Sequence, residues 1–229
     1  GLTGFAILHF WSGGATRLGV QAVWNTFNSF TLTAIPLFIL LGELLVASGL
    51  ARSVYRAMSP VFARLPGGLL HTNIAVCGMF GAVSGSSMAV AAAVGSVAYP
   101  ELTHRGYDRA TVVGSLAGGG TLGLLIPPSL SLLIYGAFTE TSIGKLFLAG
   151  IVPGALAAIL FMLWIGVMVW RNPRLAPEPE PEIGIGRALL GLGRLWPLLA
   201  LIGAVLGSLF AGLATPTESA GVGVAAAIV

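Results

Sequence analysis

Residues 69–100 read LLHTNIAVCGMFGAVSGSSMAVAAAVGSVAYP, an apolar run whose length decides the fold. As one continuous helix its 32 residues would extend about 48 Å, whereas a bilayer core of about 30 Å needs only about 20 residues. The run is therefore too long for one crossing and too short for two crossings with a loop. Its centre, residues 81–87, reads GAVSGSS and is rich in residues that weaken a helix. We expect a re-entrant hairpin, in which two half-helices meet at this Ser/Gly tip.

The composition of the whole chain indicates an integral membrane protein. Hydrophobic residues make up 56% of the 229 positions and charged residues only 8%, and the mean hydropathy is +0.94. A soluble domain carries about 25% charged residues, because it has a large surface to cover. A soluble enzyme and a disordered chain are therefore excluded. The net charge of +3 is spread over scattered arginines, which argues against nucleic-acid binding.

Further apolar stretches predict an all-α membrane protein. They are residues 1–11, 31–50, 110–138, 146–170 and 189–213. The RNPRLAPEPEPEIG segment that follows the fourth stretch is too rich in proline for a membrane helix and predicts a polar linker. Residues 215–218, TPTE, predict a helix start with Thr as the N-cap and Glu at the third helical position. Because the chain starts with Gly and stops inside an apolar stretch, we expect it to be part of a longer protein.

A second interruption lies within the stretch 110–138, where residues 126–129 read IPPS. The two prolines remove two backbone donors and clash with the preceding turn, so the helix should break there. Non-helical backbone survives in a membrane only where it is buried in protein or lines a wet cavity. We therefore expect this break and the hairpin tip to meet halfway through the membrane.

The basic residues support the hairpin. If residues 69–100 re-enter and residues 110–138 cross once, nine arginines share one side and only Arg17 and Lys145 face the other. The nine are Arg52, Arg56, Arg64, Arg105, Arg109, Arg171, Arg174, Arg187 and Arg194. A full crossing by 69–100 would split the basic residues four against seven. The positive-inside rule favours the first arrangement and places the hairpin base, with His71 and His104 at the interface, in the cytoplasm.

Two broken helices that meet in a membrane provide the chemistry of a secondary transporter. Half-helix N-termini attract an anion, while freed carbonyls and hydroxyls can coordinate a small cation such as Na⁺. Hydroxyl oxygens suit a hard cation, and they are supplied here by Ser84, Ser86, Ser87 and Ser129. Close helix packing is the alternative for this cluster. Packing alone does not require three serines around a glycine, so we favour the binding site.

Other signals point to structural roles. Packing is the favoured explanation for the three GxxxG pairs Gly114/Gly118, Gly119/Gly123 and Gly203/Gly207. An intramembrane serine protease is set aside, because the residues before Gly85 lack the G-x-S-G pattern and His71 lies about 20 Å along the helix from Ser84. Glu43 is an intramembrane acid and hence a functional candidate, whereas capping explains Glu218.

The sequence resembles the large membrane subunit of TRAP (tripartite ATP-independent periplasmic) transporters. The resemblance is carried by residues 78–154, which include SGSS, GY, IPPS and the LFLAGIVPG run, in this order. Residues 34–51, AIPLFILLGELLVASGLA, and residues 213–223, LATPTESAGVG, also look like that family. The Pro/Glu linker is the main part of the chain that the resemblance does not cover.

The resemblance implies the inverted-repeat fold of the ion-transporter superfamily, an elevator mechanism, and Na⁺ rather than ATP as the energy source. The chain would contain the first repeat only. The cation and substrate site would include Ser84, Gly85, Ser86, Ser87, Pro127, Pro128 and Ser129. The implied partners are a small membrane subunit, separate or fused, and a periplasmic binding protein that delivers organic anions, often dicarboxylates. The alternative is a Na⁺/carboxylate symporter of the same superfamily that works without a binding protein.

The resemblance also implies a multi-pass protein of a bacterial or archaeal inner membrane, with no enzymatic activity. We expect scaffold helices in residues 1–67 and a transport region in residues 68–145. This region would contain the hairpin at 69–105 and the broken helix at 108–138. An arm helix at 146–170, the cytoplasmic linker at 171–187 and a truncated second repeat at 188–229 would follow.

Overall fold

The computed structural model describes residues 2–10, 16–28, 30–177 and 192–228, and every regular element within these ranges is a helix. Four helical segments in the described part are long and apolar enough to cross a membrane: Phe30–Ala47, Arg109–Thr139, Ile143–Arg171 and Gly193–Phe210. They coincide with four of the expected apolar stretches. The all-α membrane fold is therefore confirmed.

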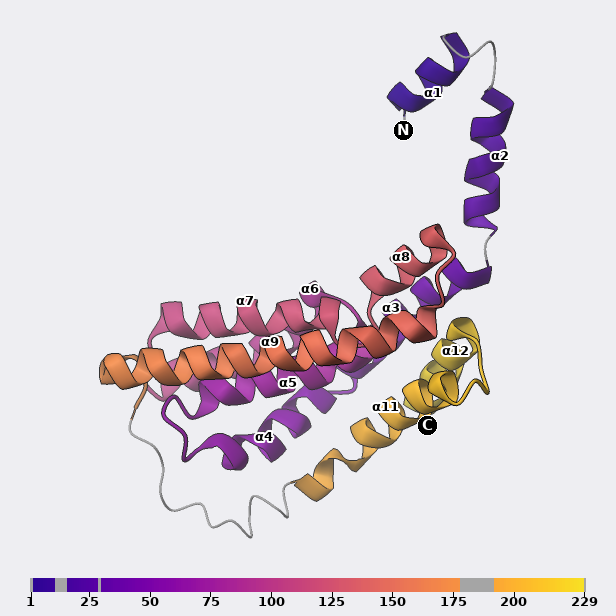
Figure 1. Cartoon of the computed structure of the whole chain (residues 1–229). Helices are drawn as coiled ribbons and strands as arrows, with labels where there is room; N and C mark the ends of the chain where they lie inside the picture. The colour runs from indigo at the N-terminus through magenta and orange to yellow at the C-terminus, as the bar shows by residue number, and fades with distance from the viewer. Residues whose placement is uncertain (1, 11–15, 29, 178–191, 229) are drawn as a thin grey trace.

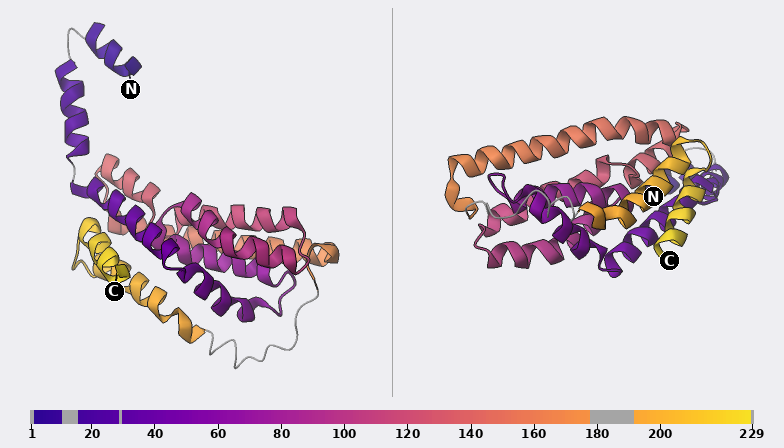
Figure 2. Two further views of the ribbon diagram at one scale, coloured as in Figure 1. Left: turned by 180° about the vertical axis from the view of Figure 1, so that it is seen from behind. Right: turned by 90° about the horizontal axis from the view of Figure 1, so that it is seen from below.

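Helices α1 (Leu2–Phe10) and α2 (Thr16–Phe27) project away from the other helices (Figures 1 and 2). The short 3-10 helix η1 (Phe30–Thr33) leads into α3 (Ala34–Ala47), which packs against the hairpin and against the last helix. Gly49, at a φ of 72°, then turns the chain into the next helix.

That next helix, α4 (Leu50–Phe62), was not among the expected apolar stretches, because it has two unlike faces. Val54, Tyr55 and Met58 are buried, whereas Arg52 and Arg56 are exposed. Apolar residues at this spacing give a helix that lies on the rest of the protein with one polar face outward. The described spanning candidates do not include α4.

Helices α5 (Leu69–Ser84) and α6 (Ser87–His104) form a hairpin, because the chain reverses direction between them. The two outer ends lie together: the backbone N–H of Leu69 donates to the hydroxyl of Tyr107 at 3.2 Å. His71 was expected to present its side chain at the membrane interface, and the structure differs. Its side chain is buried, and Nε2 lies 2.8 Å from the carbonyl oxygen of Pro66. The loop before α5 folds over this side chain.

Helix α7 (Arg109–Leu125) packs along the hairpin and α9, and is separated from α8 (Leu130–Thr139) by the IPPS segment (Figures 1 and 2). Asp108 caps α7 by accepting hydrogen bonds from the backbone and hydroxyl of Thr111, both at 2.8 Å. These bonds hold the pKa of Asp108 below its usual value, so the carboxylate is ionised at neutral pH. Helix α9 (Ile143–Arg171) then runs the length of the bundle.

After α9 come η2 (Pro173–Leu175), η3 (Gly193–Leu195), α11 (Trp196–Phe210) and α12 (Pro216–Ile228). The predicted start of α12 is confirmed. The Glu218 carboxylate accepts hydrogen bonds from the backbone N–H and hydroxyl of Thr215 at 2.7 and 2.8 Å, and the Thr215 hydroxyl accepts from the Glu218 N–H at 3.3 Å. Most of the expected linker, residues 178–187, lies outside the described residues.

The bundle has two distinct ends. At the end we call the base end, the Asp108 N–H donates to the carbonyl of Leu175 at 3.0 Å, which joins the loop after α6 to the chain after α9. The loop before α5 lies there too, because a Cβ on Gly67 would be 2.9 Å from Cγ2 of Ile165. Five of the nine arginines lie in these segments or at the helix ends that adjoin them: Arg64, Arg105, Arg109, Arg171 and Arg174.

Candidate functional site

The hairpin tip and the interruption between α7 and α8 are in direct contact. The backbone N–H of Leu130 donates to the carbonyl of Gly85 at 3.4 Å. Gly85 has a φ of 60°, and a Cβ there would lie 2.6 Å from the carbonyl oxygen of Pro128. Only glycine accommodates both the left-handed backbone and this close approach. The structure thus brings together the two interruptions that the sequence predicts.

The hairpin tip is built by three consecutive residues with different roles. Ser84 ends α5, Gly85 turns the chain, and Ser86 is the N-cap of α6, with its hydroxyl accepting from the Ala89 N–H at 3.4 Å. Serine is favoured at an N-cap because its oxygen satisfies a free backbone donor of the first helical turn. The SGSS motif therefore ends one helix and begins the next within two residues.

The interruption between α7 and α8 uses its own serine in the same way. Ser129 is the N-cap of α8 and accepts from the Leu132 N–H at 3.4 Å, while its hydroxyl donates to the carbonyl of Leu124 at 2.6 Å. The Leu124 carbonyl lies in the last turn of α7, where carbonyl groups lack a helical partner. The prolines at 127 and 128 have no N–H to donate to it, so the Ser129 hydroxyl takes that place. Pro127, Pro128 and Ser129 are all buried.

Four helix ends meet where the hairpin tip contacts the interruption between α7 and α8. The C-terminal ends of α5 and α7 bring carbonyl groups, and the N-terminal ends of α6 and α8 bring N–H groups. Helix dipoles place partial negative charge at the first pair of ends and partial positive charge at the second. Such an arrangement can hold a small cation and an anion side by side without a fixed ionic charge.

Ser84 is the side chain that stands out chemically. It is 1% exposed, and its hydroxyl has no hydrogen-bond partner among the described residues. A buried hydroxyl without a partner is costly, and in a native site it calls for an explanation. Helix α3 covers it closely, since a Cβ on Gly42 would lie 2.9 Å from the Cβ of Ser84.

Glycines from a second helix cover the interruption between α7 and α8. A Cβ on Gly150 of α9 would lie 2.8 Å from the carbonyl oxygen of Leu125, and one on Gly154 would lie 2.8 Å from Cγ1 of Ile126. Gly42, Gly150 and Gly154 were not among the residues predicted for the site. The four-residue spacing of Gly150 and Gly154 was the available signal.

The remaining candidates lie apart from this contact or only at its edge. Ser87 is half-buried at the first turn of α6, and its carbonyl faces Gly120 of α7, whose Cβ would lie 3.2 Å away. Glu43 is exposed on α3, and Glu218 is occupied by the cap of α12. The described residues contain no cluster of three or more His, Cys, Asp or Glu side chains suited to a metal ion.

Comparison with known proteins gives a consistent assignment. Residues 1–229 match the family "Tripartite ATP-independent periplasmic transporter, DctM component". The C4-dicarboxylate TRAP transporter large permease protein DctM of Pseudomonas aeruginosa is 38% identical over 97% of this chain and 51% of its own length. The protein of the same name from Vibrio cholerae is 35% identical over 97% of this chain and 49% of its own length.

A third relative is a longer protein. The isethionate TRAP transporter permease protein DctMQ of Oleidesulfovibrio alaskensis is 34% identical over 87% of this chain but only 31% of its own length. The chain spans about half the length of the two DctM relatives. The match over the full chain, together with the SGSS hairpin and the IPPS interruption in contact, shows that the chain belongs to the DctM family of TRAP transporter large permease components.

Proposed function

We propose that this chain forms the first half of a sodium-coupled TRAP permease subunit that imports carboxylate anions. Residues 84–87 and 127–129 would supply its half of the cation and substrate site. The observation that carries the proposal is the buried, unpartnered hydroxyl of Ser84 beside the two helix interruptions. Hard cations prefer oxygen ligands, and an Na⁺ ion would satisfy this oxygen.

The dipoles of the site support a carboxylate as the second ligand. The N-termini of α6 and α8 point their first N–H groups toward the contact, and such ends favour negative charge. Relatives named for C4-dicarboxylate and isethionate transport fit an anionic substrate. The second repeat of the inverted-repeat fold would complete the site. The two half-sites, one from each repeat, would then move together in an elevator motion.

The proposed partners follow from the family. A small membrane subunit would bind the large one, and a periplasmic protein would deliver the substrate to this complex in the inner membrane. The relative named DctMQ supports the option of a fused small subunit. The names of the relatives favour this complex over a symporter that works without a binding protein.

Uptake by the full-length protein in proteoliposomes tests the site. We expect Ser86→Leu or Ser87→Leu to lower sodium-driven uptake at least tenfold, because a bulky side chain would displace the ion or disturb the tip. Ser53→Leu is the matched control, because Ser53 is an exposed residue of α4 and should leave uptake unchanged. Unchanged uptake by both tip variants would reject the assignment.

The requirement for a binding protein is tested in the same vesicles. Uptake should depend on the periplasmic binding protein and should stop when the sodium gradient is collapsed. Uptake without the binding protein would favour the symporter, and uptake that needs ATP would reject both secondary-transport mechanisms.

A further inference from the structure

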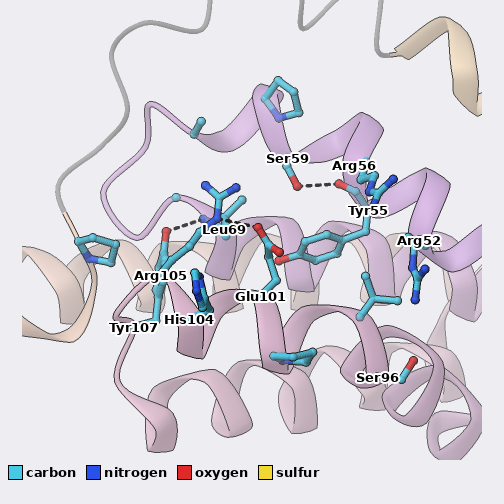
Figure 3. Close-up of a pocket in the computed structure, with 16 residues that line it drawn as sticks. Arg52, Tyr55, Arg56, Ser59, Leu69, Ser96, Glu101, His104, Arg105 and Tyr107 are labelled. Carbon is cyan, nitrogen blue, oxygen red and sulfur yellow. Dashed lines mark hydrogen bonds and ion pairs between the residues drawn. The ribbon is translucent and has the colours of Figure 1, made fainter.

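A cavity of about 880 Å³ lies at the opposite end of the hairpin from the tip, between α4 and the outer ends of α5 and α6. Figure 3 shows side chains of α4 facing those at the end of α6 across this space. The tip is one full length of α5 away, about 24 Å for its 16 residues. The cavity is therefore separate from the proposed transport site.

Positive charge dominates the cavity. Arg52 and Arg56 of α4 line it, as does Arg105 from the end of α6. Glu101 is the single carboxylate among the lining residues, and it accepts a hydrogen bond from Nε of Arg105 at 2.8 Å. Three guanidinium groups thus face one carboxylate, which leaves two positive charges in excess.

Arg52 and Arg56 provide this excess. They are four residues apart, so their side chains leave the same face of α4. Within the described part of the chain their guanidinium groups form no ion pair or hydrogen bond. A guanidinium group is a planar fork of donors that matches the oxygens of a phosphate. The pair is thus available to bind an anion of this type.

Part of the remaining wall is apolar, and the cavity lies near the base end of the bundle. Polar side chains also line it: Tyr55, Ser59, Ser96, His104 and Tyr107. Leu69, Val97, Pro60, Pro100 and Ala63 line it beside the charged groups. The base end carries five arginines, whereas the two basic residues expected on the other side are Arg17 and Lys145, and the positive-inside rule therefore places the base end at the cytoplasmic membrane surface. A basic pocket between helices at this level suits the headgroup of an acidic lipid, with its glycerol and first methylenes against the apolar wall.

We propose that this cavity binds the phosphate group of an acidic phospholipid, held by Arg52 and Arg56. Inorganic phosphate presents the same kind of oxygen acceptors to the arginines, but it has no apolar part to contact the apolar residues of the wall, so we expect the lipid to be the ligand. Bound there, the lipid would bridge α4 and the base of the hairpin. This proposal concerns lipid binding alone and does not depend on sodium coupling.

The test uses the full-length protein in a zwitterionic detergent, titrated with phosphatidylglycerol while bound lipid is counted by native mass spectrometry. We expect the double variant Arg52→Gln/Arg56→Gln to weaken the apparent affinity about 30-fold, which corresponds to roughly 1 kcal/mol per arginine. Arg171→Gln/Arg174→Gln is the matched control, because it removes two exposed arginines from the base end that do not line the cavity.

An equal loss of phosphatidylglycerol affinity in the two double variants would mean that the lipid is attracted to the basic surface in general, and it would overturn the proposal. Equal binding of phosphatidylcholine and phosphatidylglycerol by the unchanged protein would also overturn it. A thermal-unfolding assay compares the two anion sources. If inorganic phosphate raises the melting temperature of the protein and phosphatidylglycerol does not, the cavity binds a soluble anion and the lipid proposal is overturned. If the double variant fails to fold, the single variant Arg52→Gln should still weaken lipid binding about fivefold.

Discussion

At the scale of single residues, Ser84 makes the sharpest prediction. Its hydroxyl is buried without a partner, so Ser84→Ala removes no hydrogen bond among the described residues. Deleting such a group is close to neutral for stability, and the melting temperature of the full-length protein should stay equal or rise. If the oxygen binds Na⁺, the sodium concentration for half-maximal uptake should rise about tenfold, because a bond to a charged group contributes about 1.5 kcal/mol or more.

Two measurements on the same variant therefore separate a binding role from a packing role. A fall in melting temperature with an unchanged sodium dependence would mean that the hydroxyl serves packing, and the ion site would have to lie elsewhere. Ser115→Ala is a useful comparison, because its hydroxyl accepts from Nδ2 of Asn73 and donates to the carbonyl of Val112, both at 2.8 Å. That substitution should destabilise the protein and leave the sodium dependence unchanged.

At the level of single residues, the reciprocal hydrogen bonds of Thr215 and Glu218 were predicted from their spacing, and the structure confirms them. Ser86 and Ser129 were expected as cation ligands, and the structure shows that each also caps a helix, a role that the sequence pattern had not indicated. The sequence did not indicate that Gly42 covers Ser84. Contacts between residues more than forty positions apart depend on how helices are placed, and local composition does not encode that placement.

At the scale of elements, the close contact of α5 with α7 depends on glycine. A Cβ on Gly81 would lie 2.8 Å from Cα of Gly123, and the atom it meets is backbone that cannot rotate away. Gly81→Ala should therefore push the two helices apart, and overpacking of this kind costs about 1–3 kcal/mol. We expect a lower melting temperature and weaker substrate uptake by the full-length protein.

Gly114→Ala is the matched control on α7. A Cβ there meets nothing within 4 Å among the described residues, and alanine favours a helix by roughly 0.5–1 kcal/mol. Its melting temperature should be equal or higher. If Gly81→Ala is as stable as Gly114→Ala, the close packing of α5 on α7 is not a constraint on the fold.

The elements themselves could be predicted to different degrees. Length and composition predicted the hairpin and the interrupted helix, since both follow from bilayer thickness and proline chemistry. Helix α4 was missed because only apolar stretches were considered, whereas its signal is an alternation of apolar and charged faces. Packing was expected for Gly114 of α7 and for Gly203 and Gly207 of α11, yet a Cβ on any of the three would meet nothing within 4 Å in the described part of the chain.

At the scale of the whole molecule, the arrangement in the bilayer is the remaining prediction, and it can be tested by labelling single cysteines. The hairpin requires Leu65 and His104 to be reached from the same, cytoplasmic, side, and Thr141 from the other. All three side chains are exposed, whereas the natural Cys77 is fully buried and should not react. Position 71 at the hairpin base is unsuitable, because the structure buries His71.

A membrane-impermeant maleimide applied to intact cells and to inverted vesicles gives the decisive comparison. Leu65→Cys and His104→Cys should react only in inverted vesicles, and Thr141→Cys only in intact cells. The physical reason is that α5 and α6 together return the chain to its starting side, while α7 and α8 carry it across once. Labelling of positions 65 and 104 from opposite sides would mean that residues 69–100 cross the bilayer. The nine-to-two distribution of basic residues would then no longer hold, and the hairpin would lose the support of the positive-inside rule.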